Sequence, residues 1–306
     1  MKNFTLLLLF ILSSSLIAQT QLGADIDGET AGDQSGFSVS LSSDGTIIAI
    51  GAIYNGNQVG HVRVYGRGPG AGVWTQFGAD IDGEAAGDNS GFSVSLSDDG
   101  TIVAIGALEN DGNGNSAGHV RVYGYFNGSW SQLGSDIDGE AADDQSGFSV
   151  SLSDDGTIVA IGAPYNGGNG NNSGHVRVYE YANSSWSQLG SDIDGEAADD
   201  QSGFSVSLSD DGTIVAIGAP YNDGNGNYSG HVRVYGYINY GFGYSWSQLG
   251  ADIDGEAAFD ISGTSVSLSS DGTIIAIDAN GNDGNGTDAG HVRVYGYSSG
   301  SWSQLG

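Results

Sequence analysis

The chain has 306 residues, a formal net charge of −30, 54 glycines, 3 prolines and no cysteine. Nucleic acids and anionic membrane surfaces would repel so acidic a protein. Without cysteine it can form no disulfide bond and carry no lipidated N-terminal cysteine. We interpret the acidity as a solvated surface, with a dedicated metal-binding surface as the alternative.

Residues 1–18 have the pattern of a secretory signal peptide. Lys2 supplies a positive charge, residues 4–17 are mostly apolar, and Ala18 is a small residue suited to cleavage. The apolar run is shorter than the roughly 20 residues that a membrane-spanning helix needs. We therefore predict a secreted or cell-surface protein, without membrane insertion, whose residues 19–306 form a single domain.

Five close copies of one sequence unit follow, with equivalent glycines at Gly36, Gly91, Gly147, Gly203 and Gly263. These glycines are 55, 56, 56 and 60 residues apart. The repeats start near residues 21, 76, 132, 188 and 248, and a partial closing strand is predicted at 302–306. Units of this length are typical of a propeller or a solenoid.

Each copy is expected to contain four strands, which are clearest in the fourth copy. Residues 204–209 alternate apolar side chains with serine, a period of two that indicates a strand. Asp-Gly at 211–212 predicts a hairpin turn, because the turn type that fits strand twist needs positive φ. Residues 213–217 are apolar on both faces and should be buried. Residues 231–235 and 246–250 supply the third strand and an outlying fourth strand.

Such a four-stranded antiparallel unit needs a neighbour on each side, because both of its faces are apolar. The alternation of Ser and Ala with bulky residues lets the bulky face of one sheet pack on the small face of the next. We therefore predict an all-β fold, a β-propeller of about five four-stranded antiparallel blades built from repeats of about 56 residues. A parallel β-helix is the alternative, but its rungs are shorter and contain no hairpin.

The closure of this ring has two candidate strands. Fourth-strand sequences occur at Trp74, Trp130, Trp186, Trp246 and Trp302, and a version without tryptophan begins at Gln21. Six fourth strands thus accompany five three-strand units. A segment from either chain end could complete the ring, and an open arc is the alternative.

Three short motifs of the fourth copy are similar to those of a known family. They are Ser-Gly-Phe-Ser-Val at 202–206, Gly-Ala-Pro at 218–220 and Gly-His-Val-Arg-Val-Tyr at 230–235. On these residues the chain resembles the FG-GAP repeat proteins of the integrin-α type, which are β-propellers. A short Ser-Asp-Asp-Gly turn replaces that family's calcium loop, so its calcium residues are not carried over. The resemblance implies extracellular recognition or adhesion and no catalysis.

One histidine and one arginine recur on the third strand of every repeat. A catalytic residue is needed once, so we predict a structural role for the histidines. The arginines are expected to pair with aspartates or to lie over an aromatic ring. The histidines are His61, His119, His175, His231 and His291, and the arginines are Arg63, Arg121, Arg177, Arg233 and Arg293.

Two acidic motifs are candidate cation sites. Asp-Ile-Asp-Gly-Glu, which begins at Asp25, Asp80, Asp136, Asp192 and Asp252, is interpreted as a solvent-facing strand edge. The second motif, Asp-Gly-Asn-Gly-Asn and its variants, alternates oxygen-bearing side chains with glycine, as a calcium loop does at its start. A plain Asn-Gly turn is the preferred interpretation, and calcium is the one cofactor suggested. The calcium candidates are Asp111, Asn113, Asn115, Asp223, Asn225, Asn227, Asp283 and Asn285.

The sequence therefore predicts a non-enzymatic recognition or adhesion module that binds an extracellular protein or glycan. A purely structural surface-layer or matrix protein is one alternative. The other is a propeller hydrolase or lyase acting on extracellular polysaccharide, which would need acidic or histidine residues unique to single repeats at one end of the ring. The non-repeated acids are Glu109, Glu180 and Asp278.

Overall fold

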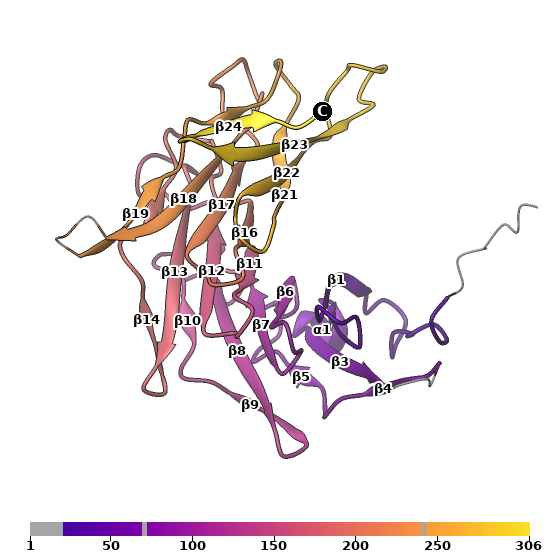
Figure 1. The fold of residues 1–306 in the computed structure, drawn as a ribbon. Coiled ribbons are helices and arrows are strands. Elements are labelled where there is room, and N and C mark those ends of the chain that lie inside the picture. Colours follow the sequence, from indigo (N-terminus) through magenta and orange to yellow (C-terminus); the bar gives the residue numbers. More distant parts are fainter. Residues whose placement is uncertain (1–20, 69–71, 240, 242) are drawn as a thin grey trace, which may run out of the picture.

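The computed structural model describes residues 21–68, 72–239, 241 and 243–306, so the predicted signal peptide at 1–18 lies outside the described residues. Five antiparallel sheets, one per repeat, follow one another as an arc (Figure 1). Within the described residues, no helix is long and apolar enough to cross a membrane. The structure confirms an all-β fold with the sheets stacked as propeller blades.

The first four sheets share one topology. Four strands pair in sequence order, and a fifth strand of two residues pairs with the third strand of the sheet. The first comprises β1 (Ser35–Leu41), β2 (Ile47–Ala52), β3 (His61–Arg67), β4 (Trp74–Gln76) and β5 (Ile81–Asp82), with the short helix α1 (Asn55–Gln58) after β2. The second comprises β6 (Ser93–Leu96), β7 (Ile102–Ala107), β8 (His119–Phe126), β9 (Ser129–Gln132) and β10 (Ile137–Asp138).

The remaining sheets repeat this plan, except that the fifth has no two-residue strand among the described residues. The third comprises β11 (Ser149–Leu152), β12 (Ile158–Ala163), β13 (His175–Ala182), β14 (Ser185–Gln188) and β15 (Ile193–Asp194). The fourth comprises β16 (Ser205–Leu208), β17 (Ile214–Ala219), β18 (His231–Asn239), β19 (Tyr244–Gln248) and β20 (Ile253–Asp254). The fifth comprises β21 (Ser262–Leu268), β22 (Ile274–Ala279), β23 (His291–Ser298) and β24 (Ser301–Gln304).

The hairpin between the first two strands of each sheet forms as predicted. In the fourth sheet, Gly212 has a φ of 68°. The Asp211 carboxylate accepts hydrogen bonds from the Thr213 backbone N–H at 2.9 Å and from the Thr213 hydroxyl at 2.7 Å. The side chain thus closes the turn locally, as Asx turns do.

Neighbouring sheets pack bulky side chains on smaller ones. Between the third and fourth sheets, Ala160, Val176 and Val178 contact Val215 and Ile217, and all five are buried. Equivalent clusters form at the other three interfaces. The core therefore consists of four similar layers between blades, and each blade is stabilised by its neighbours.

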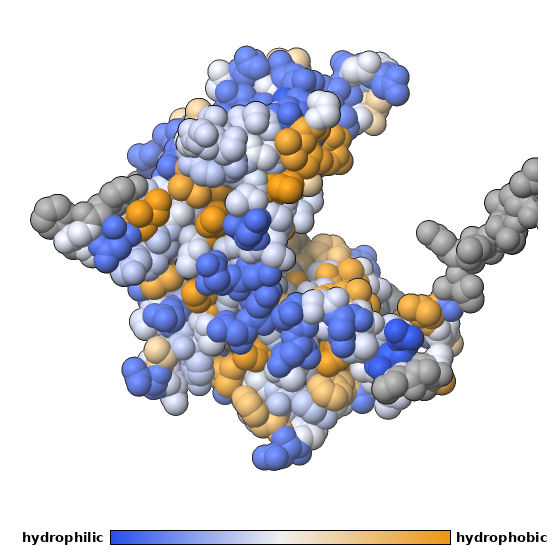
Figure 2. Space-filling model, viewed as in Figure 1, coloured by the Kyte–Doolittle hydropathy of each residue, from blue (hydrophilic) through white to orange (hydrophobic). Residues whose placement is uncertain are grey.

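The two end sheets of the arc leave apolar side chains uncovered. Leu41 on β1 is 56% exposed, whereas the equivalent Leu96 is 8% exposed. Val292 on β23 is 65% exposed, whereas Val232 is fully buried. No strand pairing joins the first and fifth sheets within the described residues, and Figure 2 shows apolar surface on both sides of the opening. The described residues thus form an open arc, with β24 as the fourth strand of its own sheet.

Candidate functional site

An open pocket of about 310 Å³ lies along the inner edge of the arc. The first strand of each sheet borders this edge, from β1 through β6, β11 and β16 to β21 (Figure 1). Serine and valine side chains at equivalent positions of all five sheets line the pocket. Most residues that line this pocket recur in every repeat, so a residue that occurs in only one repeat is easily recognised there.

A row of phenylalanines follows the same edge. Ring centroids lie 5.0 Å apart between Phe37 and Phe92, 5.1 Å between Phe92 and Phe148, and 4.7 Å between Phe148 and Phe204. The fifth repeat interrupts this row, because Thr264 stands where the other four have phenylalanine. The last three of these rings line the pocket together with Thr264.

Thr264 belongs to a polar group that occurs once in the chain. Its hydroxyl donates a hydrogen bond to the Asp278 carboxylate and accepts one from the Asn280 side-chain amide at 3.4 Å. The other Asp278 carboxylate oxygen accepts a hydrogen bond from the Ser265 backbone N–H at 2.8 Å. The carboxylate is therefore fixed beside the pocket wall.

The other repeats have glycine at the position of Asp278. A side chain at Gly218 would collide with the backbone carbonyl oxygen of Gly263 in the next sheet. The fifth sheet has no following sheet among the described residues, and this leaves room for Asp278.

The three non-repeated acids are not brought together. Glu109 accepts a hydrogen bond from Gln145 at 3.1 Å, and Glu180 lies exposed on β13. Of the three, only Asp278 bonds within the described chain to residues that line the pocket. The sequence analysis missed Thr264, although its departure from the repeated phenylalanine was a usable signal.

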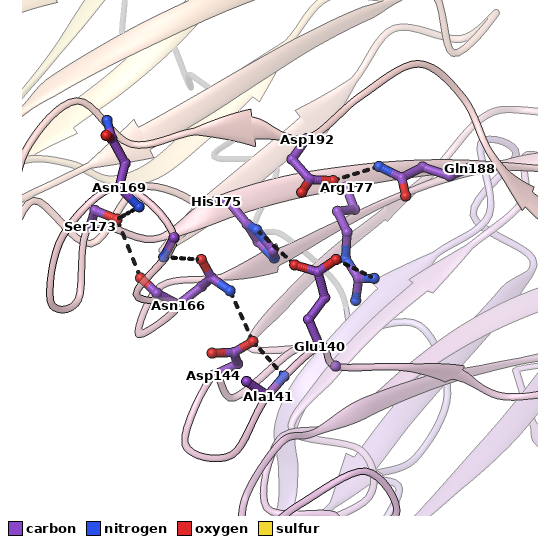
Figure 3. Close-up of polar contacts among 12 residues, drawn as sticks. Glu140, Ala141, Asp144, Asn166, Asn169, Ser173, His175, Arg177, Gln188 and Asp192 are labelled. Carbon is purple, nitrogen blue, oxygen red and sulfur yellow. Dashed lines mark hydrogen bonds and ion pairs between the residues drawn. The ribbon is translucent and has the colours of Figure 1, made fainter.

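A second group of polar side chains recurs where the linkers between sheets meet the third strand. Figure 3 shows the copy around His175 on β13, with Glu140 from the preceding linker and Asp192 from the following one. The His175 Nδ1 atom lies 3.8 Å from Glu140 Oε2, and its side chain is 2% exposed. Equivalent groups form around His61, His119 and His231.

The arginine of each third strand holds the same linker. Arg177 Nη1 lies 3.7 Å from Glu140 Oε1, and Nη2 donates a hydrogen bond to the Asp138 carbonyl at 2.6 Å. Its guanidinium also lies 5.5 Å from the centroid of the Tyr179 ring. The expected aromatic contact is confirmed, whereas the carboxylate partner is the glutamate of the linker instead of an aspartate.

Burial makes His119, His175 and His231 weak bases. Loss of solvent lowers the pKa of His175 and His119, and the neighbouring arginine lowers it further. The same causes lower the pKa of His231 to about 4. These imidazoles are therefore neutral at pH 7, with one nitrogen lone pair free for a proton or a metal ion.

The Asp-Ile-Asp-Gly-Glu motif forms the short edge strand β15, on which Asp194 is exposed while the isoleucine faces the core. Ile193 is 4% exposed and pairs with Val176 on the neighbouring strand. The flanking Asp192 and Glu196 each approach a histidine, on consecutive sheets. The motif joins two blades, because its isoleucine fills the layer between them.

The calcium candidates lie in turns that use their own side chains. Asp111, Asp223 and Asp283 each accept a hydrogen bond at 2.8 Å from the backbone N–H five residues later. Asn113 and Asn225 donate at 2.8 Å to the carbonyls of Gly139 and Gly255, while Asn115 donates to Asp143 at 3.3 Å. Asn227 and Asn285 lie in the same turns. Calcium binding at these loops stays a prediction.

Comparison with known proteins confirms the family resemblance. Residues 136–179 and 192–235 match the FG-GAP repeat model. The chain is an FG-GAP-like repeat protein. No curated protein matches it.

Two solved structures resemble this FG-GAP-like protein over most of its length. One is a putative 6-phosphogluconolactonase from Bacteroides uniformis, with a TM-score of 0.59 and 12% identity, covering 89% of this chain and 71% of that chain. The other is the periplasmic gluconolactonase of Pseudomonas aeruginosa, with a TM-score of 0.59 and 16% identity, covering 88% and 70%. At this identity, the likeness shows the fold alone.

These findings overturn two expectations, namely that the protein is not an enzyme and that it is an adhesion module. Both expectations depended on the link between the FG-GAP repeat and adhesion. The same blade arrangement occurs in proteins named as lactonases, which are hydrolases. A fold does not determine a function, so the residues of the site have to decide it.

Proposed function

We propose that the protein is an extracytoplasmic hydrolase that opens sugar lactones in the pocket along the inner edge of the arc. The observation that carries this proposal is the Thr264–Asp278 pair: Thr264 occurs once in a pocket otherwise lined by repeated residues, and its hydroxyl donates to the Asp278 carboxylate beside the pocket wall. A catalytic group is needed once, so polar residues that occur in only one repeat and converge on a pocket are candidates for catalysis. The lactonases of similar fold support the substrate class.

The substrate-binding part of the pocket is the aromatic row. The faces of Phe148 and Phe204 offer apolar surface on which the C–H groups of a sugar ring can pack. The serine side chains beside them offer hydroxyls for the sugar's polar groups. Such packing would place the lactone carbonyl near Thr264, at the end of the row.

Asp278 is the general base in this mechanism. Its carboxylate accepts a proton from a water molecule, and the water oxygen attacks the lactone carbonyl carbon. The ring C–O bond then breaks, and the leaving oxygen takes up a proton to give a hydroxy acid. Thr264, held by Asn280, and the Ser265 N–H orient the carboxylate, so Thr264 is a positioning residue.

The test is hydrolysis of gluconolactone, followed by acid release at constant pH. Asp278→Asn should lower kcat by on the order of 100-fold or more, because it removes the general base. Asp288→Asn is the matched control, since Asp288 is an exposed acid in the loop between β22 and β23, outside the pocket lining, and it should leave kcat unchanged. Wild-type rates no faster than the uncatalysed reaction, or equal rates for the two variants, would overturn the proposal.

A further inference from the structure

We propose that the four Glu–His–Asp groups beside the third strands each bind one divalent transition-metal ion. The ligands are the histidine Nδ1 and one oxygen from each carboxylate. The groups are Glu29–His61–Asp80, Glu84–His119–Asp136, Glu140–His175–Asp192 and Glu196–His231–Asp252. None of these side chains lines the inner pocket, so the inference is independent of the proposed hydrolase activity.

The spacing of the three donor atoms is the first observation. In the third group, the His175 Nδ1 and Glu140 Oε2 atoms are 3.8 Å apart, beyond the roughly 2.7–3.2 Å of an N–H···O hydrogen bond. The three donor atoms of each group lie within 4.8 Å of one another. Atoms that bind one zinc ion at about 2.0–2.2 Å are themselves roughly 3–4 Å apart, so a small inward movement would bring all three into contact with an ion.

The buried histidine is the second, independent observation. The His231 side chain is 2% exposed, its Nε2 has no hydrogen-bond partner in the described part of the chain, and its Nδ1 lies 3.8 Å from Glu196 Oε2. A buried polar group without a partner costs free energy. Its Nδ1 faces the Glu196 carboxylate at a distance too long for a hydrogen bond, so an ion bound between them would give Nδ1 a partner.

The surrounding contacts hold each carboxylate with one oxygen turned toward the histidine (Figure 3). Gln188 donates to Asp192 Oδ1 at 2.6 Å, and Arg177 lies near Glu140 Oε1, so the second oxygen of each carboxylate is free. Buried Asp144 fixes the turn after Glu140 by accepting a hydrogen bond from the Ala141 N–H at 3.0 Å. Outer contacts of this kind orient ligands in metal sites.

The identity of the donors points to a class of ion. Imidazole nitrogen with two carboxylates suits Zn²⁺, Co²⁺ or Ni²⁺, whereas Ca²⁺ takes oxygen ligands only. Each ion would join a linker paired with one blade to the third strand of the next blade. The sites would therefore tie blades together in a chain that has no cysteine.

The fifth repeat provides an internal control. His291 Nδ1 lies 3.9 Å from Glu256 Oε2, but no aspartate completes the group within the described residues. The His291 side chain is also 26% exposed, in contrast to the 2% of its buried counterparts. The inference thus predicts four ions per chain and not five.

The experiment is a calorimetric titration of the chelator-treated protein with Zn²⁺. Wild type should bind four ions, His175→Gln should bind three, and His291→Gln should still bind four. If His175→Gln fails to fold, Glu140→Gln provides the same test, because Glu140 is half-exposed. This variant should also bind three ions. The Co²⁺ form should show visible absorption that falls by one quarter in either third-group variant.

Two outcomes would overturn the proposal. The first is the absence of saturable Zn²⁺ binding at micromolar to millimolar concentrations. The second is equal stoichiometry in wild type, Glu140→Gln and His291→Gln, which would indicate adventitious binding to the acidic surface. Neither outcome depends on lactone hydrolysis, so failure here and failure of the proposed activity are distinguishable.

Discussion

At the scale of single residues, glycine is required where the backbone enters a hairpin at the edge of a blade. Gly156 has a φ of 69°, and a Cβ atom there would lie 2.7 Å from the side chain of Ile102 in the preceding sheet. Both the backbone conformation and the contact exclude a branched side chain. The same pair of constraints recurs at Gly100 and Gly212.

We expect Gly156→Val to lower the free energy of unfolding by about 1–3 kcal/mol, because a strained φ costs that much for a residue with a side chain. Denaturant unfolding would measure the change. Gly128→Ala is the control: Gly128 has a φ of 90° but nothing within 4 Å of its Cβ position, so its cost should be smaller. An unchanged midpoint for Gly156→Val would contradict the role of the turn.

At the scale of elements, the hairpin turns of successive sheets stack on one another through backbone hydrogen bonds. The Asp154 N–H donates to the Asp210 carbonyl at 2.9 Å, and the Asp98 N–H donates to the Asp154 carbonyl at 2.8 Å. This places three carboxylates side by side along the arc. Partial burial, followed by the charges of Asp210 and Asp98, raises the pKa of Asp154 to about 6.

The raised pKa predicts how stability changes with pH. Because folded Asp154 holds its proton up to about pH 6 and an unfolded aspartate only to about 3.9, its contribution to stability falls as pH rises from about 4 to 6. Asp154→Asn removes the charge, so it should raise the unfolding temperature at pH 7.5 and have little effect at pH 4. Scanning calorimetry in the presence of a chelator would measure this. An equal gain at both pH values would show that the carboxylates do not interact.

At the scale of the whole molecule, the net charge of −30 opposes compaction, so cations of any kind should stabilise the fold by screening. In the loops that resemble calcium sites, Asp223 already accepts a backbone hydrogen bond and Asn225 donates one. These side chains hold a turn, which agrees with the turn interpretation of the sequence.

We therefore expect millimolar calcium and magnesium at equal ionic strength to raise the unfolding temperature by similar amounts. Calcium binds flexible oxygen loops much better than magnesium, which is reluctant to lose water. A larger gain with calcium that Asp223→Ala abolishes would contradict the turn interpretation and establish a calcium site. Thermal unfolding with each ion, in wild type and variant, would decide between them.

The sequence by itself determined the local and repeated features of this protein. The period of 55–60 residues, the alternation along residues 204–209 and the Asp-Gly turns predicted five four-stranded sheets, because strand pattern and turn chemistry are properties of neighbouring residues. Repetition also predicted how blades pack, since every interface uses the same side chains. Asp278 was identified as a non-repeated acid for the same reason.

Only the tertiary structure decided which distant side chains meet. The pairing of Asp278 with Thr264, and of His175 with carboxylates from two linkers, depends on the path of the chain between blades. Repetition favoured a structural role for the histidines, and this stays a prediction; only the tertiary structure shows that an atom such as His231 Nε2 is buried without a hydrogen-bond partner in the described part of the chain. The sequence also left open whether the blades form a closed ring or an open arc, because similar repeats do not determine the angle between one blade and the next.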